Sequence, residues 1–119
     1  MADYVALRKD KDSIQVCFYV ENDKVMAIGE KMNAINDAAY MNGYNWEAFF
    51  RYYLEKNASE ILEGMDTDPE AGMYSAYYEP TAENETRAER FVEIIRSLID
   101  NEKEIYQIVQ EEGDEIEWD

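Results

Sequence analysis

The sequence contains no histidine and only one cysteine among its 119 residues. The absence of histidine excludes Ser-His-Asp triads, imidazole general bases and histidine-ligated metal centres. A lone cysteine excludes an internal disulfide, thiolate zinc cages and CxxC redox chemistry. We interpret Cys17 as a small packing residue rather than a nucleophile. An enzyme that uses lysine, serine or tyrosine as its catalytic residue is still compatible with the composition, but no residue pattern in the chain points to one.

Long apolar runs and glycine-rich loops are also missing. No apolar run approaches the roughly 18 residues that a membrane span requires. The first residues lack the basic segment and the apolar stretch of a signal peptide, so we expect a cytoplasmic protein. The five glycines are scattered, which leaves no phosphate-binding loop. We therefore expect no cofactor.

Basic residues are scarce as well: 11 lysines and arginines stand against 28 carboxylate side chains, for a net charge of −17 at pH 7. Such a surface repels phosphate backbones and anionic lipid headgroups, so nucleic-acid and membrane binding are disfavoured. A basic macromolecule is the natural partner. High negative charge also keeps proteins soluble, and composition does not separate these two explanations.

What is present is enough apolar material for a folded core. The chain is 46% hydrophobic and 13% aromatic, too rich in core-forming residues for a disordered protein. Its length fits one domain, residues 1–119, with a modest core that needs no metal or disulfide.

Strict alternation of apolar and polar residues predicts a hairpin over residues 3–21, with strands at 4–8 and 13–20. The core-facing residues of the second strand are Ile14, Val16, Phe18 and Val20.

Helical spacing of apolar residues predicts two helices after this hairpin. Asp23 is expected to be the N-cap of the first, whose apolar stripe is Val25, Ile28, Met32, Ile35 and Ala39. The second is expected to follow a turn at Asn42-Gly43, with Asn45 as its N-cap. Its stripe is the best core candidate in the chain, at about 1.5–3 kcal/mol for each fully buried side chain. It consists of Trp46, Phe49, Phe50, Tyr53 and Leu54.

Turn residues predict a second hairpin over about residues 62–79, with a short strand at 62–67 and a longer one at 73–78. In the turn between them, Pro69 presets φ and Gly72 can accept a left-handed conformation.

Two more helices are expected at residues 81–100 and 102–111, the second ended by Gly113. The acidic tail after Gly113 is either frayed or a last strand with Ile116 and Trp118 facing inward. The predicted order is β-β-α-α-β-β-α-α. It is typical of an α+β domain with an antiparallel sheet and helices packed on one face.

One acidic segment needs a test as a metal site. Asp66, Asp68 and Glu70 are spaced like the start of an EF-hand loop. Gly72 then falls at the seventh loop position instead of the sixth, and Tyr77 stands where the bidentate glutamate belongs. We therefore expect an acidic turn without a metal.

Ten tyrosines give the chain residues that serve both cores and interfaces. Several lie near predicted turns and helix ends, where they either cap a small core or anchor a protein partner. These are Tyr40, Tyr44, Tyr52, Tyr77 and Tyr78.

Two motifs resemble a known family. Residues 42–47, followed by the aromatic helix, and residues 68–74 are similar to the immunity protein 51 family of bacterial polymorphic toxin systems. The resemblance spans most of the chain. It implies an α+β domain, without catalytic residues, that binds a cognate toxin domain in the cytoplasm and blocks it.

The resemblance and the charge together suggest that acidic side chains with aromatic anchors bind the toxin. The candidate residues are Asp66, Asp68, Glu70, Asp114, Glu115, Glu117, Tyr44, Tyr77 and Trp118. If the toxin is a nuclease, its basic groove would accept such a surface as a phosphate mimic. The alternatives are an acidic regulatory or adaptor domain that binds another basic protein, and a small enzyme or cation-binding domain that uses carboxylates. Nothing in the sequence supports a homo-oligomer.

Overall fold

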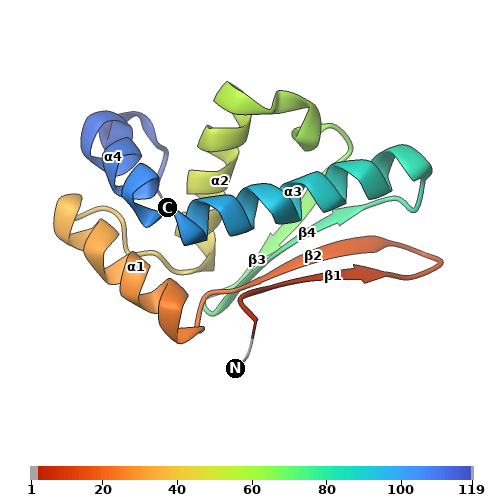
Figure 1. The fold of residues 1–119 in the computed structure, drawn as a ribbon, viewed down its shortest axis with the longest axis horizontal. Helices are drawn as coiled ribbons and strands as arrows, with labels where there is room; N and C mark the ends of the chain where they lie inside the picture. The colour runs from red at the N-terminus through yellow and green to blue at the C-terminus, as the bar shows by residue number, and fades with distance from the viewer. Residues whose placement is uncertain (1–2, 119) are drawn as a thin grey trace.

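The computed structural model describes residues 3–118, in which hairpins and helix pairs alternate (Figure 1). The elements are β1 (Val5–Lys9), β2 (Ile14–Tyr19), α1 (Asp23–Ile35), α2 (Gly43–Asn57), β3 (Asp66–Pro69), β4 (Met73–Tyr78), α3 (Ala82–Asp100) and α4 (Glu102–Glu112). Short 3-10 turns follow α2 at Ser59–Leu62 and α4 at Gly113–Glu115. The predicted order ββααββαα and the α+β class are confirmed.

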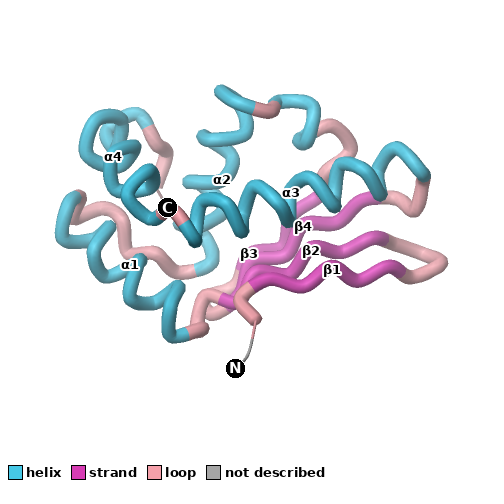
Figure 2. The backbone as a smooth tube through the Cα atoms, in the orientation of Figure 1, coloured by secondary structure: helices cyan, strands magenta, loops and turns pink. Residues whose placement is uncertain are grey.

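The four strands form one antiparallel sheet in the order β1-β2-β4-β3. The two hairpins meet along β2 and β4, so the sheet centre joins segments about half the chain apart (Figure 2). Phe18 on β2 lies opposite Val5 on one side and Tyr74 on the other. Because directly opposed residues share a face, this register gathers the apolar set on one side of the sheet.

That apolar face is covered by two helices. Helix α3 packs against β1 and β2, and α2 packs against β3 and β4. Helices α1 and α4 pack against each other beside this layer (Figure 1). None of the described elements covers the opposite face of the sheet, which bears the alternate residues of each strand.

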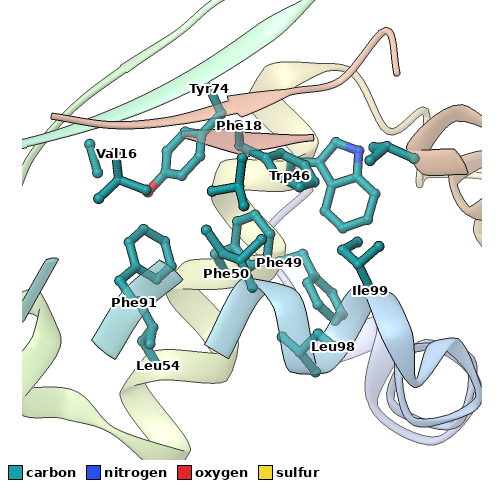
Figure 3. Packing of buried hydrophobic residues seen from close by; sticks show 14 of the residues in the cluster. Val16, Phe18, Trp46, Phe49, Phe50, Leu54, Tyr74, Phe91, Leu98 and Ile99 are labelled. Carbon is teal, nitrogen blue, oxygen red and sulfur yellow. The ribbon is translucent and has the colours of Figure 1, made fainter. Parts of the chain in front are cut away.

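The aromatic stripe of α2 is the centre of the core, as predicted (Figure 3). Trp46, Phe49 and Phe50 are fully buried between the sheet and α3. The Phe18 ring lies 5.0 Å from that of Trp46, and the Phe50 ring lies 5.7 Å from that of Phe91, both edge to face. Such geometry adds about 0.5–1.5 kcal/mol per pair beyond the burial of area.

Both predicted helix N-caps are wrong by a few residues. Asn22, not Asp23, caps α1 and accepts hydrogen bonds from the backbone of Lys24 and Val25. Asn42 caps α2 by accepting from the backbone N–H of Asn45. Asn45 is instead fully buried, and its side-chain oxygen accepts from the Met41 backbone N–H. Several neighbouring asparagines can serve as caps, so residue type alone does not select among them.

Helix α1 is also shorter than its apolar pattern predicts. It ends at Ile35, whose side chain is 41% exposed, and Ala39 is buried in the following loop rather than on the helix. The left-handed residue in this loop is Met41, with φ 54°, rather than a residue of the Asn42-Gly43 pair.

Gly43 is required for a different reason: the backbone of the β3–β4 turn passes directly over it. A Cβ atom at Gly43 would lie 1.8 Å from the Glu70 carbonyl oxygen and 2.5 Å from that of Met73. The Gly43 N–H donates to the Ala71 carbonyl at 3.1 Å. The start of α2 is thereby joined to the tip of the second hairpin.

The second hairpin is confirmed, but its first strand begins later than predicted. Residues 59–62 form a 3-10 turn, and β3 occupies Asp66–Pro69. Gly72 does not adopt a left-handed conformation; among the described residues, the glycine with positive φ is Gly64, at 74°. Within residues 114–118 the acidic tail forms no strand, but a 3-10 turn leads to a buried Ile116, and Trp118 packs against the core.

We expect Gly43→Ala to lower the free energy of unfolding by about 3 kcal/mol or more, because the added methyl group meets backbone that cannot move aside. Urea denaturation monitored by circular dichroism measures the change. Gly72→Ala is the matched control, because its methyl group would meet only the flexible carboxyl end of Glu21. The control should stay within about 1 kcal/mol of wild type. Equal stability of the two variants would contradict the close approach at Gly43.

Candidate partner-binding surface

The nine candidate residues do not form one cluster in the structure. Three lie on the uncovered side of the second hairpin, namely Asp66, Asp68 and Tyr77. Glu70 lies in the turn beyond β3, against the start of α2. Tyr44, Glu115 and Glu117 line a groove beside α2. The remaining two, Asp114 and Trp118, belong to the C-terminal segment.

The hairpin group lies on the face of the sheet that no described helix covers. Asp66 is opposite Tyr77, and Asp68 is opposite the small Ser75. Gln15 on β2 donates from its side chain to the Tyr77 hydroxyl at 3.1 Å and to the Ser75 hydroxyl at 3.3 Å. The tyrosine is therefore held in place beside two exposed carboxylates, as an interface anchor would be.

This uncovered face is charged with opposite sign at its two edges. Arg8 lies on the outer strand β1 and donates to the Tyr19 hydroxyl at 3.4 Å. Asp66 and Asp68 lie on the other outer strand, β3. A partner that binds here would need basic groups over β3, and electrostatic complementarity of this kind favours one docking orientation.

The second group lies in a groove of about 620 Å³ between α2 and the C-terminal segment. The residues of α2 that line this groove recur at intervals of three or four positions, so their side chains lie on one face of the helix. The lining residues are Tyr44, Glu47, Ala48, Arg51, Tyr52, Glu55, Glu115 and Glu117. The lining therefore contains four carboxylates and one guanidinium group, that of Arg51, which lies 4.0 Å from Glu47. The groove has a strong negative excess and suits a basic ligand surface.

Sequence reasoning missed the α2 wall of this groove. Glu47, Arg51 and Glu55 lie on the polar side of α2, whereas the sequence analysis considered only the apolar side of this helix. Their four-residue spacing was a visible signal of a shared face. The C-terminal segment lies opposite this face only because of the tertiary fold. Residue spacing within one helix carries no information about that packing.

A polar cluster fixes the end of α4 against α2. Glu112 accepts a hydrogen bond from Lys56 Nζ at 2.7 Å and another from the Tyr52 hydroxyl at 2.6 Å. The bond from Lys56, and then the bond from Tyr52, lower the pKa of Glu112 below its ordinary value. The same contacts raise the pKa values of Lys56 and Tyr52. The ammonium group also lies 4.9 Å from the centre of the Tyr52 ring, a cation–π distance.

The C-terminal candidates differ from one another in role. Asp114 is exposed and is not among the residues that line the groove. Trp118 is partly buried against the core, and its indole N–H donates to the Gly113 carbonyl at 3.0 Å. These contacts hold the segment that carries Glu115 and Glu117, so Trp118 positions the groove wall rather than presenting a free aromatic ring.

The structure offers little that would support metal binding or membrane insertion. Within residues 3–118, no group of three or more acidic, cysteine or histidine side chains could hold a metal ion. No helix in the same range is long and apolar enough to cross a membrane.

The chain matches the model of a known protein family. The model of the family described as Immunity protein 51 matches residues 5–114, a span that runs from β1 to just beyond α4. No curated protein and no solved structure matches the chain.

We expect Lys56→Met to raise the pKa of Glu112, because the largest cause of its low value is then removed. Carboxyl-detected NMR titration measures this change directly. A carboxyl group whose pKa is lowered on folding contributes stability above its unfolded pKa, and that contribution is lost as the pH falls through the folded value. The variant should therefore lose less stability than wild type on acidification below about pH 4.5.

Lys103→Met is the matched control. Lys103 is exposed near the start of α4, so this substitution removes the same charge at a site away from Glu112. It should leave the pKa of Glu112 unchanged. An equal rise in both variants would mean that net charge, rather than the Lys56 contact, sets the titration.

Proposed function

The chain belongs to the immunity protein 51 family of polymorphic toxin systems, and on that premise we propose that it neutralises its toxin by covering the toxin's active surface. Members of such families bind cognate toxins and are non-enzymatic inhibitors. Family membership thus confirms the prediction that the chain is not an enzyme. The mode of blockade and the nature of the toxin are the parts that we propose.

The observation that carries the proposal is a surface excess of carboxylates that the protein does not neutralise internally. Ion pairs among the described residues engage seven of the eleven lysines and arginines. The same ion pairs engage nine of the 28 acidic side chains, and most of the other carboxylates within residues 3–118 are exposed. A basic protein surface is the complement of such a charge distribution.

A nuclease fits this requirement best among toxin activities. An enzyme that binds a phosphate backbone needs a basic groove. Carboxylates held on rigid strands and helices can occupy that groove in place of phosphates. Electrostatic steering would also accelerate association, which suits an inhibitor that must act before the toxin reaches its substrate.

The proposed contact surface joins the two groups of candidates through the β3–β4 turn. Glu70 in this turn lies against Gly43, the residue that precedes Tyr44 of the groove. A protein interface typically buries about 800 Å² on each partner and involves about 20–30 residues on each side, which is enough to include the turn and the groups that flank it. We assign the hairpin carboxylates Asp66 and Asp68, with Tyr77, to contact by the toxin. Glu115 and Glu117 form the second arm of this surface.

We expect the double variant Asp66→Lys, Asp68→Lys to bind the toxin more weakly by about tenfold or more, with most of the loss in the association rate. The same variant should show a weaker dependence of binding on salt concentration. Surface plasmon resonance with the cognate toxin domain, at two or more salt concentrations, measures both effects. Glu115→Lys with Glu117→Lys tests the groove arm in the same way.

Glu93→Lys is the control for net charge, because Glu93 is exposed on α3, away from both groups. Unchanged affinity in both double variants would refute the site assignment. Co-expression of the wild-type protein with the cognate toxin tests the function itself. Cell survival together with co-purification supports the proposal, and cell death without a complex favours the adaptor alternative.

A further inference from the structure

A third surface lies between α1 and the loop that leads to α2, next to the turn that carries Glu70. It is a groove of about 390 Å³ whose lining includes Glu21, Met26, Glu30, Tyr40, Asn42 and Ala71. We call it the α1 groove. Its walls are mainly apolar, and none of the nine predicted contact residues lines it.

Two of the most exposed large apolar side chains in the described chain line the α1 groove. Tyr40 is 72% exposed and Met26 is 49% exposed. Single exposed apolar residues are normal, but two that share one concave surface are typical of a protein-binding site. Tyrosine is enriched at interface hot spots, and methionine adapts its shape to a partner.

The exposure of Tyr40 does not come from a loosely held loop. Ala39, on one side of it, is buried, and its carbonyl accepts from the Asn33 side chain at 3.0 Å. Met41, on the other side, is buried and donates its N–H to the fully buried Asn45. Tyr40 therefore projects from backbone that is anchored at both neighbours.

The floor of the α1 groove is equally constrained. A Cβ atom at Gly29 would lie 3.0 Å from Cβ of Met41, so the loop packs directly on the helix backbone. Met41 adopts a left-handed conformation, which is strained for a non-glycine residue and persists only where its surroundings hold it. A rigid groove of this kind lowers the entropy cost of binding.

The charge of the α1 groove selects the chemistry of its occupant. Its charged lining residues are Glu21 and Glu30, both acidic and both exposed. An arginine side chain matches apolar walls with an acidic rim. Its aliphatic stem packs on Met26 and Tyr40, its guanidinium group can stack on the tyrosine ring, and its charge meets a carboxylate. Arginine is also one of the residue types enriched at hot spots.

We infer that the α1 groove receives an arginine of the toxin and anchors the complex there. The inference rests on the proposed function, because the occupant is the toxin. Ala71 and Asn42 belong both to this groove and to the junction between the β3–β4 turn and α2. The groove therefore adjoins the turn that carries Glu70, and one interface can include both. A second copy of this chain is disfavoured as occupant by the net charge of −17.

The test compares Tyr40→Ala and Met26→Ala with Ile35→Ala in binding to the cognate toxin domain. Ile35 is 41% exposed on the same helix as Met26 but does not line the groove, so it is a matched control. We expect Tyr40→Ala to weaken binding by about tenfold or more, mainly through faster dissociation. Ile35→Ala should bind as wild type does. Urea denaturation of each variant establishes that the fold is retained.

The arginine itself is tested from both sides. Glu30→Gln should weaken binding, and the loss should disappear against one toxin variant in which an arginine is replaced by alanine. A double-mutant cycle of that kind isolates the pairwise contact. A cycle between Glu93→Gln and the same toxin variant should show no coupling.

Two outcomes overturn the inference while leaving the proposed function intact. In the first, wild-type protein neutralises the toxin and the Tyr40, Met26 and Glu30 variants bind as tightly as wild type. In the second, analytical ultracentrifugation shows a dimer of this chain that Tyr40→Ala dissociates, which would make the groove a self-association surface. Failure of the wild-type protein to bind the toxin would instead refute the proposed function.

Discussion

The contact between the start of α2 and the tip of the second hairpin organises both the core and the candidate surface. Gly43 leaves no room for a side chain beneath the Glu70 carbonyl and donates its N–H to Ala71. This contact fixes where the aromatic helix enters the layer above the sheet, so that Trp46 and Phe50 reach Phe18. It also fixes the turn relative to the grooves on either side. Stability and recognition therefore share one backbone contact.

How well each feature could be predicted from the sequence depends on how far apart along the chain the interacting residues lie. Alternation identified the first hairpin, turn residues identified the second, and helical spacing identified the four long helices, because apolar burial and turn chemistry leave local patterns in the sequence. Local signals at the helix starts failed, because several asparagines could cap and only the neighbouring backbone decides which one does. The role of Gly43 was out of reach for a related reason: it depends on residues 27 positions and more along the chain.

The candidate surface was only partly predictable. The two-residue spacing of Asp66 and Asp68 gives them a shared face on β3, but the predicted strand ended at residue 67 and left Asp68 in the turn. Tyr77 lies next to them because it is paired with Asp66 in the register of β3 and β4. A sequence prediction gives this register only when it places the hairpin turn correctly. The groove beside α2 and the α1 groove each combine segments that are distant in sequence. The composition shows ten tyrosines but not which of them are exposed. Tyr40 is exposed, whereas Tyr78 is buried and its hydroxyl donates a hydrogen bond to the Ile61 carbonyl.

Charge and shape contribute differently to recognition by such a protein. Screening in physiological salt extends over about 8 Å, so many carboxylates act together on an approaching basic surface, and no single one determines its orientation. An acidic protein could therefore attract many basic proteins with similar strength. Discrimination among them requires short-range contacts that only one partner completes. The rigid backbone on both sides of Tyr40 can provide such a contact, because a fixed apolar wall beside Glu30 rewards a matching side chain and leaves a mismatched one unpaired.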